Sequence, residues 1–594
     1  MLPQVKPMYS RDRMAYMRKV LISVFVAIFV AACAPTAIMP DADVVVISVL
    51  GTNDVHGELV TQPNRGGITT FSGYVAALRD ARRNDGAVLL VDAGDMWQGT
   101  LESNLSEGAP VVEAYNALGY AAAAIGNHEF DFGPVGPKSI PEEDGDDPQG
   151  ALRQRATETD FPLLAANLID ASTGQRVDWE NVHSSTMVTR AGINIGIVGV
   201  LTRDAPQTTI AANTAGVEVA PLAESIITQA KALRADGASL VVVVAHAGGR
   251  CEEFTDPTDL SSCDQSGEIL QVANQIPQGL VDHIVAGHVH RGIAHIVNDI
   301  AVTASYSNSR AFSRADFTLD RNTGEVLDRK VFPPQNNCAR AADARGACTF
   351  EDDASREAAS YEGRRVVPMA RVAAIAERAR EAAARRQAEE LGVFIETPMT
   401  LRDRPESALG ILMTDALLES NDADIAIHNV YGGIRAELPA GELTYGSVFR
   451  MFPFDNRIAI LELTGKDLRK IIAIQAHNTG RHAGFSGMRV YVGCNDDYMS
   501  IRMVRPDGRE IEDADMLRVV ANDFLLMGGD DVLTPAMPAD GFDIPYGTPL
   551  VRDVLVSWFR NRGGRLRADE FLNPDKRRWN LPDPLPQSCA FSGS

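Results

Sequence analysis

Five short motifs in the first half of the chain contain residue types that bind metal ions and transfer protons. Carboxylate, imidazole and amide groups form a nitrogen and oxygen ligand set that suits Zn, Mn, Fe or Co better than Ca. Two such ions about 3.5–4 Å apart would need a shared carboxylate, and Asp95 is the natural bridge. In chain order the candidates are Asp54 and His56 in GTNDVHGE, Asp95 in DAGDMWQG, Asn127 and His128 in GNHEFD, His246 in AHAGG, and His288 and His290 in GHVH.

The GNHEFD motif contains a second pair, His128 and Asp131, three residues apart. A carboxylate within reach of an imidazole fixes the tautomer of the ring and favours its protonated form. We therefore expect His128 to stabilise a transition state or to assist a leaving alkoxide. The alternative is that His128 is a further metal ligand or a strand cap. Glu129 is expected to have no catalytic role.

The motifs follow apolar runs in residues 44–300, where a β-branched run, a glycine-rich loop and a helical pattern repeat. Nearly continuous apolar runs predict strands that are buried on both faces with helices between them, which is an α/β fold. Ligands of such sheets bind beyond the carboxyl ends of the strands. A single Asp or His at a strand end is more often a turn former or a solvated group, but five motifs in this order make coincidence hard to sustain.

These blocks resemble the calcineurin-like metallophosphoesterases, in particular the 5′-nucleotidase family of bacterial UDP-sugar hydrolases and animal ecto-5′-nucleotidase. The resemblance covers nearly the whole mature chain. It implies an N-terminal four-layer αββα metallophosphoesterase domain, a linker helix and a C-terminal α+β substrate-binding domain. It also implies two divalent metal ions (Zn, Mn, Co or similar), one held by Asp54, His56, Asp95 and His290 and the other by Asp95, Asn127, His246 and His288.

The resemblance extends to substrate contacts in the second half of the chain. It implies that Phe454 in FPFDN and Phe524 in NDFLLMGGDD sandwich a nucleobase and that Asp530 holds ribose hydroxyls. Stacking on aromatic rings tolerates different bases, so a nucleotide is expected without a preferred base. Taken alone, each phenylalanine is more often a core residue.

Arginines in two motifs are candidates to bind phosphate through bidentate geometry, namely Arg435 in NVYGGIRAEL and Arg402 or Arg404 in TLRDRPESALG. Both motifs depart from the family. Where the family often reads N-G-G-G-I-R, counting back from Arg435 puts Val430 rather than Asn429 at the base-contacting place, and Tyr431 replaces the first glycine. In the other motif Asp403 occupies the aligned arginine position. Either the substrate contacts differ or the loop has slipped by one residue.

The expected activity is release of phosphate from nucleoside 5′-monophosphates, and also from UDP-sugars or dinucleotides, by direct attack of hydroxide. Metal coordination lowers the pKa of water from about 15.7 toward about 7, which supplies that nucleophile at neutral pH. A cyclic 2′,3′-nucleotide phosphodiesterase and a sulfur-ester hydrolase with the same metal site are the enzymatic alternatives. A catalytically silent surface lipoprotein is the alternative of another class.

Length and composition give the expected organisation. A chain of 594 residues with 45% hydrophobic content predicts two or more globular domains. The net charge of −23 argues against binding duplex nucleic acid. We expect a signal peptide at 1–33, a linker at 34–44, the metallophosphoesterase domain at 45–335, a linker and connector helix at 336–395, the substrate-binding domain at 396–580 and a tail at 581–594. The connector helix, after Pro368 and ending near Gly392, could instead be a surface helix of the second domain.

The N-terminus predicts export. The segment MRKVLISVFVAIFVAACAP has basic residues, an apolar run and small residues before Cys33, which is the layout of a secretory signal. It resembles the bacterial lipobox, so Cys33 would carry lipid and tether a periplasmic or cell-surface protein to the membrane, with Ala34 favouring the outer membrane. The alternative is a signal anchor, for which the apolar run is short. The six other cysteines predict disulfides, and sequence alone permits 15 connectivities.

Overall fold

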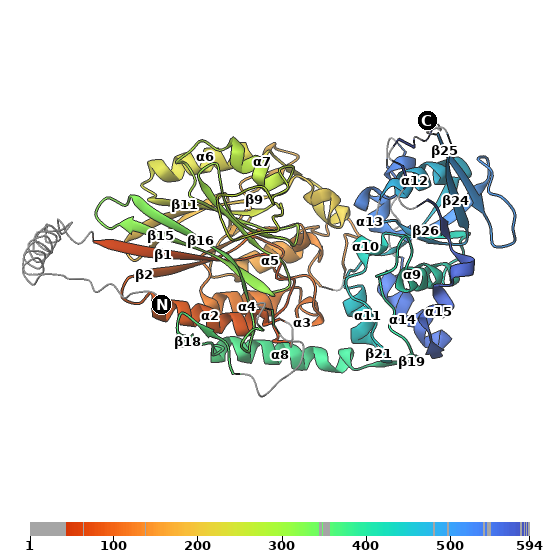
Figure 1. The fold of residues 1–594 in the computed structure, drawn as a ribbon, viewed down its shortest axis with the longest axis horizontal. Helices are drawn as coiled ribbons and strands as arrows, with labels where there is room; N and C mark the ends of the chain where they lie inside the picture. The colour runs from red at the N-terminus through yellow and green to blue at the C-terminus, as the bar shows by residue number, and fades with distance from the viewer. Residues whose placement is uncertain are drawn as a thin grey trace, which may run out of the picture.

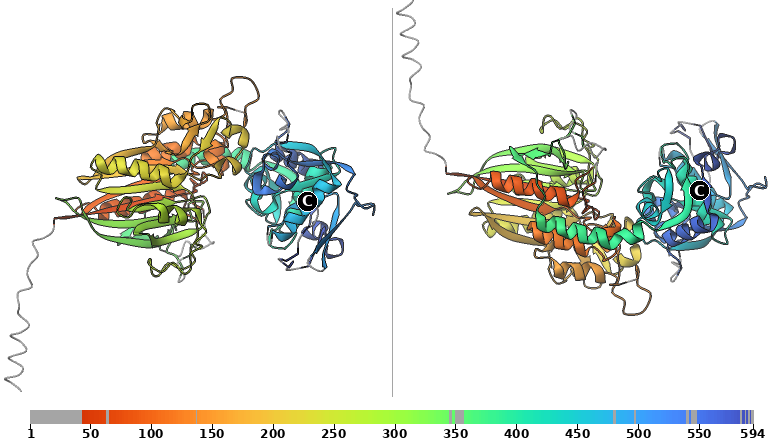
Figure 2. Two further views of the ribbon diagram at one scale, coloured as in Figure 1. Left: turned by 90° about the horizontal axis from the view of Figure 1, so that it is seen from above. Right: turned by 90° about the horizontal axis from the view of Figure 1, so that it is seen from below.

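The computed structural model describes residues 43–591, apart from 63–64, 137, 344–346, 349–356, 479–480, 496–497, 539–540, 543–547, 583–584, 587 and 590. The described chain forms two lobes joined by one long helix (Figures 1 and 2). The expected signal peptide, Cys33 and nearly all of the linker at 34–44 lie outside the described residues. Of the helices in the described part, none combines the length and the apolar character needed to span a membrane.

Two sheets form the centre of the first domain. The first has the strand order β16 (Val326–Asn336), β15 (Ala311–Asp320), β1 (Val44–Thr52), β2 (Gly86–Asp92), β3 (Ala122–Ala124), β4 (Leu163–Leu164) and β7 (Val182–His183). The second has the order β13 (Gly292–Val297), β14 (Ile300–Ser305), β12 (His283–Ala286), β11 (Leu240–His246), β9 (Ile193–Leu201) and β8 (Ser185–Arg190). Strands β1 to β4 are parallel, as are β9, β11 and β12, so their carboxyl ends share one edge.

Apolar strand residues pack the two sheets against each other. Ile47 and Val49 of β1 share one buried cluster with Ile195 of β9 and Val242 of β11. The outer face of the first sheet is covered by α2 (Gly67–Ala81), α4 (Ala109–Leu118), α5 (Gly150–Glu158) and part of α8, and that of the second by α6 (Leu222–Ala235) and α7 (Glu268–Gln275). These are the four αββα layers that the family resemblance implies.

The connector helix α8 (Ala370–Gln387) contacts both lobes and lies along the underside of the molecule in Figure 1. Val372 is buried among helices of the first domain, whereas Ala383 is buried in the core of the second. The helix ends before Gly392 because residues 390–395 form β19 (Glu390–Ile395). Since β19 pairs with β21 and β27, the fold of the second domain begins before the expected boundary at 396.

The second domain combines three small sheets with helices. The sheets are β21 (Gly441–Thr444), β19 and β27 (Gly564–Leu566); β22 (Ile458–Thr464), β26 (Met516–Asn522), β20 (Ile425–His428) and β23 (Gly484–Ser486); and β25 (Tyr498–Val504), β24 (Arg489–Asn495) and β28 (Trp579–Asn580). The helices are α9 (Ala408–Glu419), α10 (Val430–Gly433), α11 (Tyr445–Met451), α12 (Gly465–His477), α13 (Asp523–Leu526), α14 (Val551–Arg562) and α15 (Ala568–Phe571). Ser407 caps α9 and a Thr464–Asp467 capping box begins α12, which satisfies backbone N–H groups at both starts.

Shorter elements complete the described fold. They are α3 (Leu101–Asn104), β5 (Leu168–Asp170), β6 (Gln175–Arg176), β10 (Val217–Val219), β17 (Ser360–Tyr361), β18 (Arg364–Arg365) and the 3-10 turns η1 (His128–Phe130), η2 (Ala205–Gln207), η3 (Ala211–Thr214), η4 (Gly529–Asp531), η5 (Thr534–Ala536) and η6 (Pro574–Lys576). Three disulfides join the cysteines of the described residues, namely Cys251–Cys263, Cys338–Cys348 and Cys494–Cys589. The expectation of disulfides is confirmed, and the fold selects this pairing.

Candidate active site

The candidate metal ligands lie at the carboxyl ends of five strands, three in the first sheet and two in the second. Asp54 and His56 follow β1, Asp95 follows β2, Asn127 follows β3, His246 ends β11, and His288 and His290 follow β12. Two groups form, Asp54 with His56 and His290, and Asp95 with His246 and His288. Within each group all donor atoms lie within 4.8 Å of one another.

The backbone is strained where it carries these side chains. Asp54, His56, Asp95, His288 and His290 have φ angles of 49°, 50°, 58°, 75° and 58°. This left-handed region costs a non-glycine residue about 1–3 kcal/mol and is found mainly where function requires it. Five of the seven candidate ligands therefore lie in this region, as do residues of turns elsewhere in the described chain, such as Glu107 and Asn181.

The first group has donor atoms in the state that a metal requires. Nε2 of His56 and Nε2 of His290 are 3.1 Å apart, and the latter is 3.2 Å from Oδ1 of Asp54. The Nδ1–H of His56 donates to the carbonyl oxygen of Gln98 at 2.9 Å, which leaves the lone pair on Nε2. Burial and the neighbouring His290 lower the pKa of His56 to about 3, so the ring is neutral. Neutral imidazole is the form that binds metal.

The second group converges on Oδ1 of Asn127. Nε2 of His246 lies 2.9 Å and Nδ1 of His288 lies 3.0 Å from this oxygen. His246 donates through Nδ1 to the carbonyl of Ala93 at 2.8 Å, and Nδ2 of Asn127 donates to the carbonyl of Thr208 at 2.8 Å. These backbone acceptors orient the donor atoms toward one point, as outer partners of metal ligands do.

Asp95 faces both groups. Its Oδ2 is 3.2 Å from Nε2 of His246 and 4.0 Å from Nε2 of His56, while its Oδ1 accepts the backbone N–H of His128 at 2.9 Å. Burial lowers the pKa of His246, but the charge and hydrogen bond of Asp95 together with the charges of Asp54 and Glu129 outweigh burial and raise this pKa to about 10. A cation between Asp95 and His246 would compensate the charge of Asp95 that otherwise favours a proton on His246.

Glu129 supports this arrangement, and this supporting role of Glu129 was not predicted from the sequence. Its fully buried carboxylate accepts the N–H groups of Asp95 at 2.8 Å, Met96 at 2.7 Å and Gly126 at 2.7 Å. Its side chain does not line the cavity beside the ligands, so it holds the loop that carries Asp95 without touching a substrate. No local pattern distinguishes such a glutamate from a solvated one.

His128 and Asp131 form a direct pair. Nδ1 of His128 lies 2.7 Å from Oδ2 of Asp131, and the other carboxylate oxygen accepts the hydroxyl of Thr209 at 2.7 Å. Burial lowers the pKa of His128, but the charges of Asp131 and Asp95 outweigh burial and raise it above its usual value. The protonated ring at the cavity wall can therefore donate a proton.

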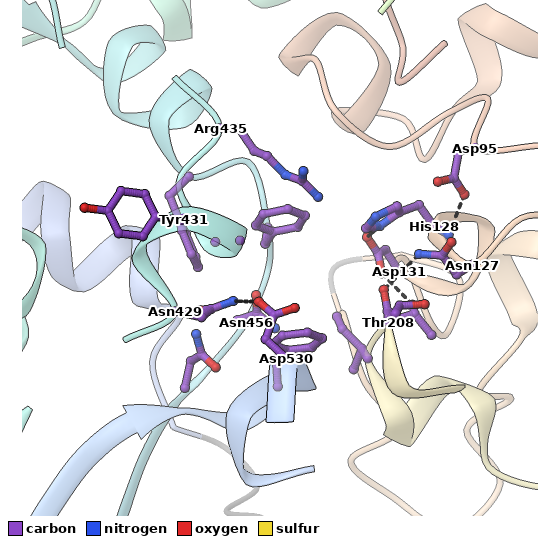
Figure 3. Close-up of a pocket in the computed structure, with 18 of the residues that line it drawn as sticks. Asp95, Asn127, His128, Asp131, Thr208, Asn429, Tyr431, Arg435, Asn456 and Asp530 are labelled. Atoms are coloured by element: carbon purple, nitrogen blue, oxygen red, sulfur yellow. Dashed lines mark hydrogen bonds and ion pairs between the residues drawn. The ribbon is translucent and has the colours of Figure 1, made fainter. Parts of the chain in front are cut away.

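A cavity of about 350 Å³ lies between the two domains, directly beside the metal-ligand groups (Figure 3). Figure 3 shows Arg435 of the second domain directed across it toward His128 of the first. The first domain contributes Asp95, Asn127, His128, Asp131, Thr208, Thr209, Ile210, His288, Val289 and His290 to its lining. The second domain contributes Arg435, Phe454, Phe524, Asp530, Asn429, Asn456, Arg481 and their neighbours.

Two family descriptions match the chain along its length. Residues 47–292 match the calcineurin-like phosphoesterase domain and residues 387–537 match the 5′-nucleotidase C-terminal domain. The chain belongs to the 5′-nucleotidase family of calcineurin-like phosphoesterases. This places it among metal-dependent phosphoester hydrolases, and the resemblance given by the motifs is confirmed.

Relatives of this family align with most of the chain. The cell wall protein Lmo0130 of Listeria monocytogenes is 26% identical over 82% of this chain, and the 5′-nucleotidase of Vibrio cholerae is 24% identical over 80% of it. The matched part spans 64% of the Listeria protein and 85% of the Vibrio protein. It spans only 37% of the endonuclease YhcR of Bacillus subtilis, which is 25% identical over 81% of this chain.

A solved structure shows the same fold. The 5′-nucleotidase precursor of Thermus thermophilus superposes with a TM-score of 0.63 at 22% identity, over 87% of this chain and 97% of that one. The sulfate thiohydrolase SoxB of the same organism reaches 0.60 at 15% identity, over 90% and 96%. Since enzymes on different esters share this fold, the residues of the cavity must decide the substrate.

The aromatic residues expected from the 5′-nucleotidase family both line the cavity. The centre of the Phe454 ring lies 5.9 Å from the centre of the His128 ring. The guanidinium carbon of Arg435 lies 5.0 Å from the centre of the same Phe454 ring. A Cβ atom at Gly529 would come within 2.3 Å of the Phe524 ring, so glycine is required for this ring to lie against the loop.

The loop before Arg435 differs from the expectation. The side chain of Asn429 lines the cavity and its Nδ2 donates to Oδ2 of Asp530 at 2.6 Å. Val430, which direct counting puts at the base-contacting place, is buried in the domain core instead. Asn429 rather than Val430 therefore faces the cavity, and Gly432 makes room for Asp530 because a Cβ there would lie 2.1 Å from its Oδ2.

The structure does not bring Arg402 or Arg404 to this cavity. The Arg402 side chain is 83% exposed, and the guanidinium of Arg404 stacks over Tyr431 at 3.7 Å. Within the described part of the chain, the arginines that line the cavity are Arg435 and Arg481. Both arginines are exposed, which motif alignment could not predict.

Proposed function

We propose that this protein releases phosphate from nucleoside 5′-monophosphates at a centre of two divalent metal ions. The observation that carries the proposal is a single cavity that contacts the candidate metal ligands on one wall and Phe454, Phe524 and Asp530 on the other. A phosphate at the first wall and a nucleoside at the second are the two halves of such a substrate.

The donor atoms fit the metal ions. Asp54, His56, Asp95 and His290 would hold one ion, and Asp95, Asn127, His246 and His288 the other. When bound, the ions lower the pKa of coordinated water and offset the charge that develops on the phosphate. The neutral ring of His56 and the close approach of its Nε2 to Nε2 of His290 support this assignment.

Residues of this chain handle the rest of the reaction. Arg435 binds phosphate oxygens through its guanidinium fork. As the bond from phosphorus to the 5′ oxygen breaks and one to the oxygen of water forms, His128 gives a proton to the leaving oxygen. Phe454 and Phe524 stack on the base, and Asp530, oriented by Asn429, accepts ribose hydroxyls.

Export and anchoring through Cys33 complete the proposal. Three disulfides support an oxidising compartment, and one relative is named a cell wall protein. Cys33→Ser should move the protein from the membrane fraction to the soluble fraction, and an unchanged distribution would remove the lipid anchor from the proposal.

The test is phosphate release by purified residues 34–594 with Mn²⁺ or Zn²⁺. AMP and UMP should be hydrolysed, and Asp95→Ala should abolish release because it removes a ligand of both ions. Phe454→Ala and Phe524→Ala should each raise KM for AMP by about tenfold, since base stacking contributes about 1–3 kcal/mol. A panel of UDP-sugars, dinucleotides, 2′,3′-cyclic nucleotides and sulfur esters tests the alternatives. Full activity of the Asp95→Ala protein would refute the two-metal centre.

A further inference from the structure

We infer that Thr209 is a positioning residue for the His128–Asp131 pair. The inference rests on the proposed function, in which this pair protonates the leaving oxygen. Thr209 is 78 residues from Asp131 in the chain and lies in the loop between η2 and η3. It belongs to none of the motifs that define the metal ligands.

The carboxylate of Asp131 uses each oxygen for one partner. Oδ2 faces Nδ1 of His128 at 2.7 Å, and Oδ1 accepts the Oγ1–H of Thr209 at 2.7 Å. Thr209 is 3% exposed and Asp131 7%, so water has little access to replace either bond. With both oxygens held, the plane of the carboxylate is fixed and so is the orientation of the His128 ring.

The loop of Thr209 and the adjoining turn η3 are attached to the GNHEFD motif at three points. The carbonyl of Thr208 accepts from Nδ2 of Asn127 at 2.8 Å, Thr209 donates to Asp131, and Nδ2 of Asn213 donates to the carbonyl of Phe130 at 2.9 Å. The loop thus supports a metal ligand and the proton-transfer pair through adjacent residues. Supporting contacts of this kind hold a catalytic group within the small tolerance that chemistry allows.

Thr209 acts through Asp131 and is not itself an acid or base. Its hydroxyl proton is donated to Oδ1 of Asp131, and this hydrogen bond is its whole contribution to the reaction. Removing it lets the carboxylate rotate and loosens the ring of His128. Proton transfer to the leaving oxygen should then slow, whereas the affinity for the substrate should stay unchanged.

The test is Thr209→Val, which is nearly isosteric and removes only the hydroxyl function. We expect kcat for AMP to fall about tenfold, with KM for AMP and bound metal per chain unchanged. Thr209→Ser should restore kcat because it returns the donor. With 4-nitrophenyl phosphate, whose leaving group needs no proton, kcat should change less than twofold.

Thr159→Val is the matched control, because Thr159 is a buried threonine of the same domain whose partners do not line the cavity. Its hydroxyl can donate to the carbonyl of Ala156 or of Phe161 and accepts from Nδ2 of Asn181. This variant should leave kcat unchanged. In the Asp131→Ala background, Thr209→Val should cause no further loss, since the two act as one unit. If the valine variant fails to fold, Thr209→Ala is measured in its place.

An unchanged kcat for AMP, an equal loss on both substrates, or a full additional loss in the Asp131→Ala background would each overturn the inference. His128→Ala and Asp131→Ala separate it from the proposed function. If these variants lower kcat and Thr209→Val does not, only the role of Thr209 is wrong. If they leave kcat for AMP unchanged as well, the proposed proton transfer itself is wrong.

Discussion

Backbone carbonyl groups orient individual candidate metal ligands. The carbonyl of Gln98 fixes the tautomer of His56, and the carbonyl of Ala93 does the same for His246. Glu129 adds a clamp on the loop of Asp95 through three N–H bonds. Outer contacts of this kind set how tightly a site holds its metal, independently of the ligands themselves.

Glu129→Gln should weaken metal binding because an amide offers one acceptor oxygen where the carboxylate offers two. We expect the affinity for Mn²⁺ to fall about tenfold to a hundredfold. Titration of the chelator-treated protein with Mn²⁺ measures it. Glu113→Gln is the control, since Glu113 pairs with Arg378 on the surface and is half exposed. Equal affinity of the folded Glu129→Gln protein and wild type would contradict the clamp.

The end of β2 carries a buried polar network that anchors the ligand loop. Asp92 accepts the hydroxyls of Thr52 at 2.6 Å and Tyr115 at 2.9 Å, and the N–H of Gly94 at 2.7 Å. Burial raises the pKa of Asp92 to about 8, although these hydrogen bonds oppose the shift. The strand end, the helix α4 that carries Tyr115 and the Asp95 loop are thereby coupled.

This network predicts a pH dependence of stability. The pKa of Asp92 rises from 3.8 in the unfolded chain to about 8 in the fold, so between these values the folded state binds one proton more. The contribution of Asp92 is fully present below about pH 4 and is lost as the pH rises through about 8, with a slope of at most about 1.4 kcal/mol per pH unit.

Urea unfolding of wild type and Asp92→Asn at pH 5, 6.5 and 8 measures this contribution. The free energy of unfolding of wild type minus that of the variant should decrease as the pH rises, because the variant has no carboxyl to ionise. A difference that stays constant over this range would show that Asp92 is ionised throughout.

At the scale of the whole molecule, the cavity exists only where the two lobes meet (Figure 3). Polar contacts join the lobes beside it: Nε2 of Gln98 donates to the carbonyl of Pro453 at 3.1 Å, and Arg457 pairs with Glu142 at 2.8 Å. Interfaces of this polar kind between domains permit relative motion. We therefore expect the second domain to rotate to admit substrate and release product.

Cross-linking across this contact tests the motion. A Glu142→Cys, Arg457→Cys double variant treated with a short bis-maleimide should lose most of its turnover, because the lobes can no longer separate. The described native cysteines are all disulfide-bonded, so the introduced thiols are the reactive ones. Each single variant treated in the same way should keep its turnover. Full activity of the cross-linked protein would count against rotation.

The local sequence pattern determined the fold class of the first domain and most of the candidate metal ligands. The apolar runs that end in Asp, His or Asn predict both the α/β fold and the residues that the structure gathers into two ligand groups, because strand periodicity and the edge of a parallel sheet are local properties. The same holds for His128 and Asp131, which are close in the chain. The order of the motifs along the chain was enough to identify the family to which the protein belongs.

Only the tertiary structure decided the contacts between distant segments. Thr209 meets Asp131 across 78 residues, Glu129 meets Asp95 across 34, and Asn429 meets Asp530 across 101. The same is true of the exposure of Arg402 and the burial of Val430 in the domain core. These contacts and exposures depend on how loops from distant parts of the chain pack together. Residue types and their spacing along the sequence do not determine that packing.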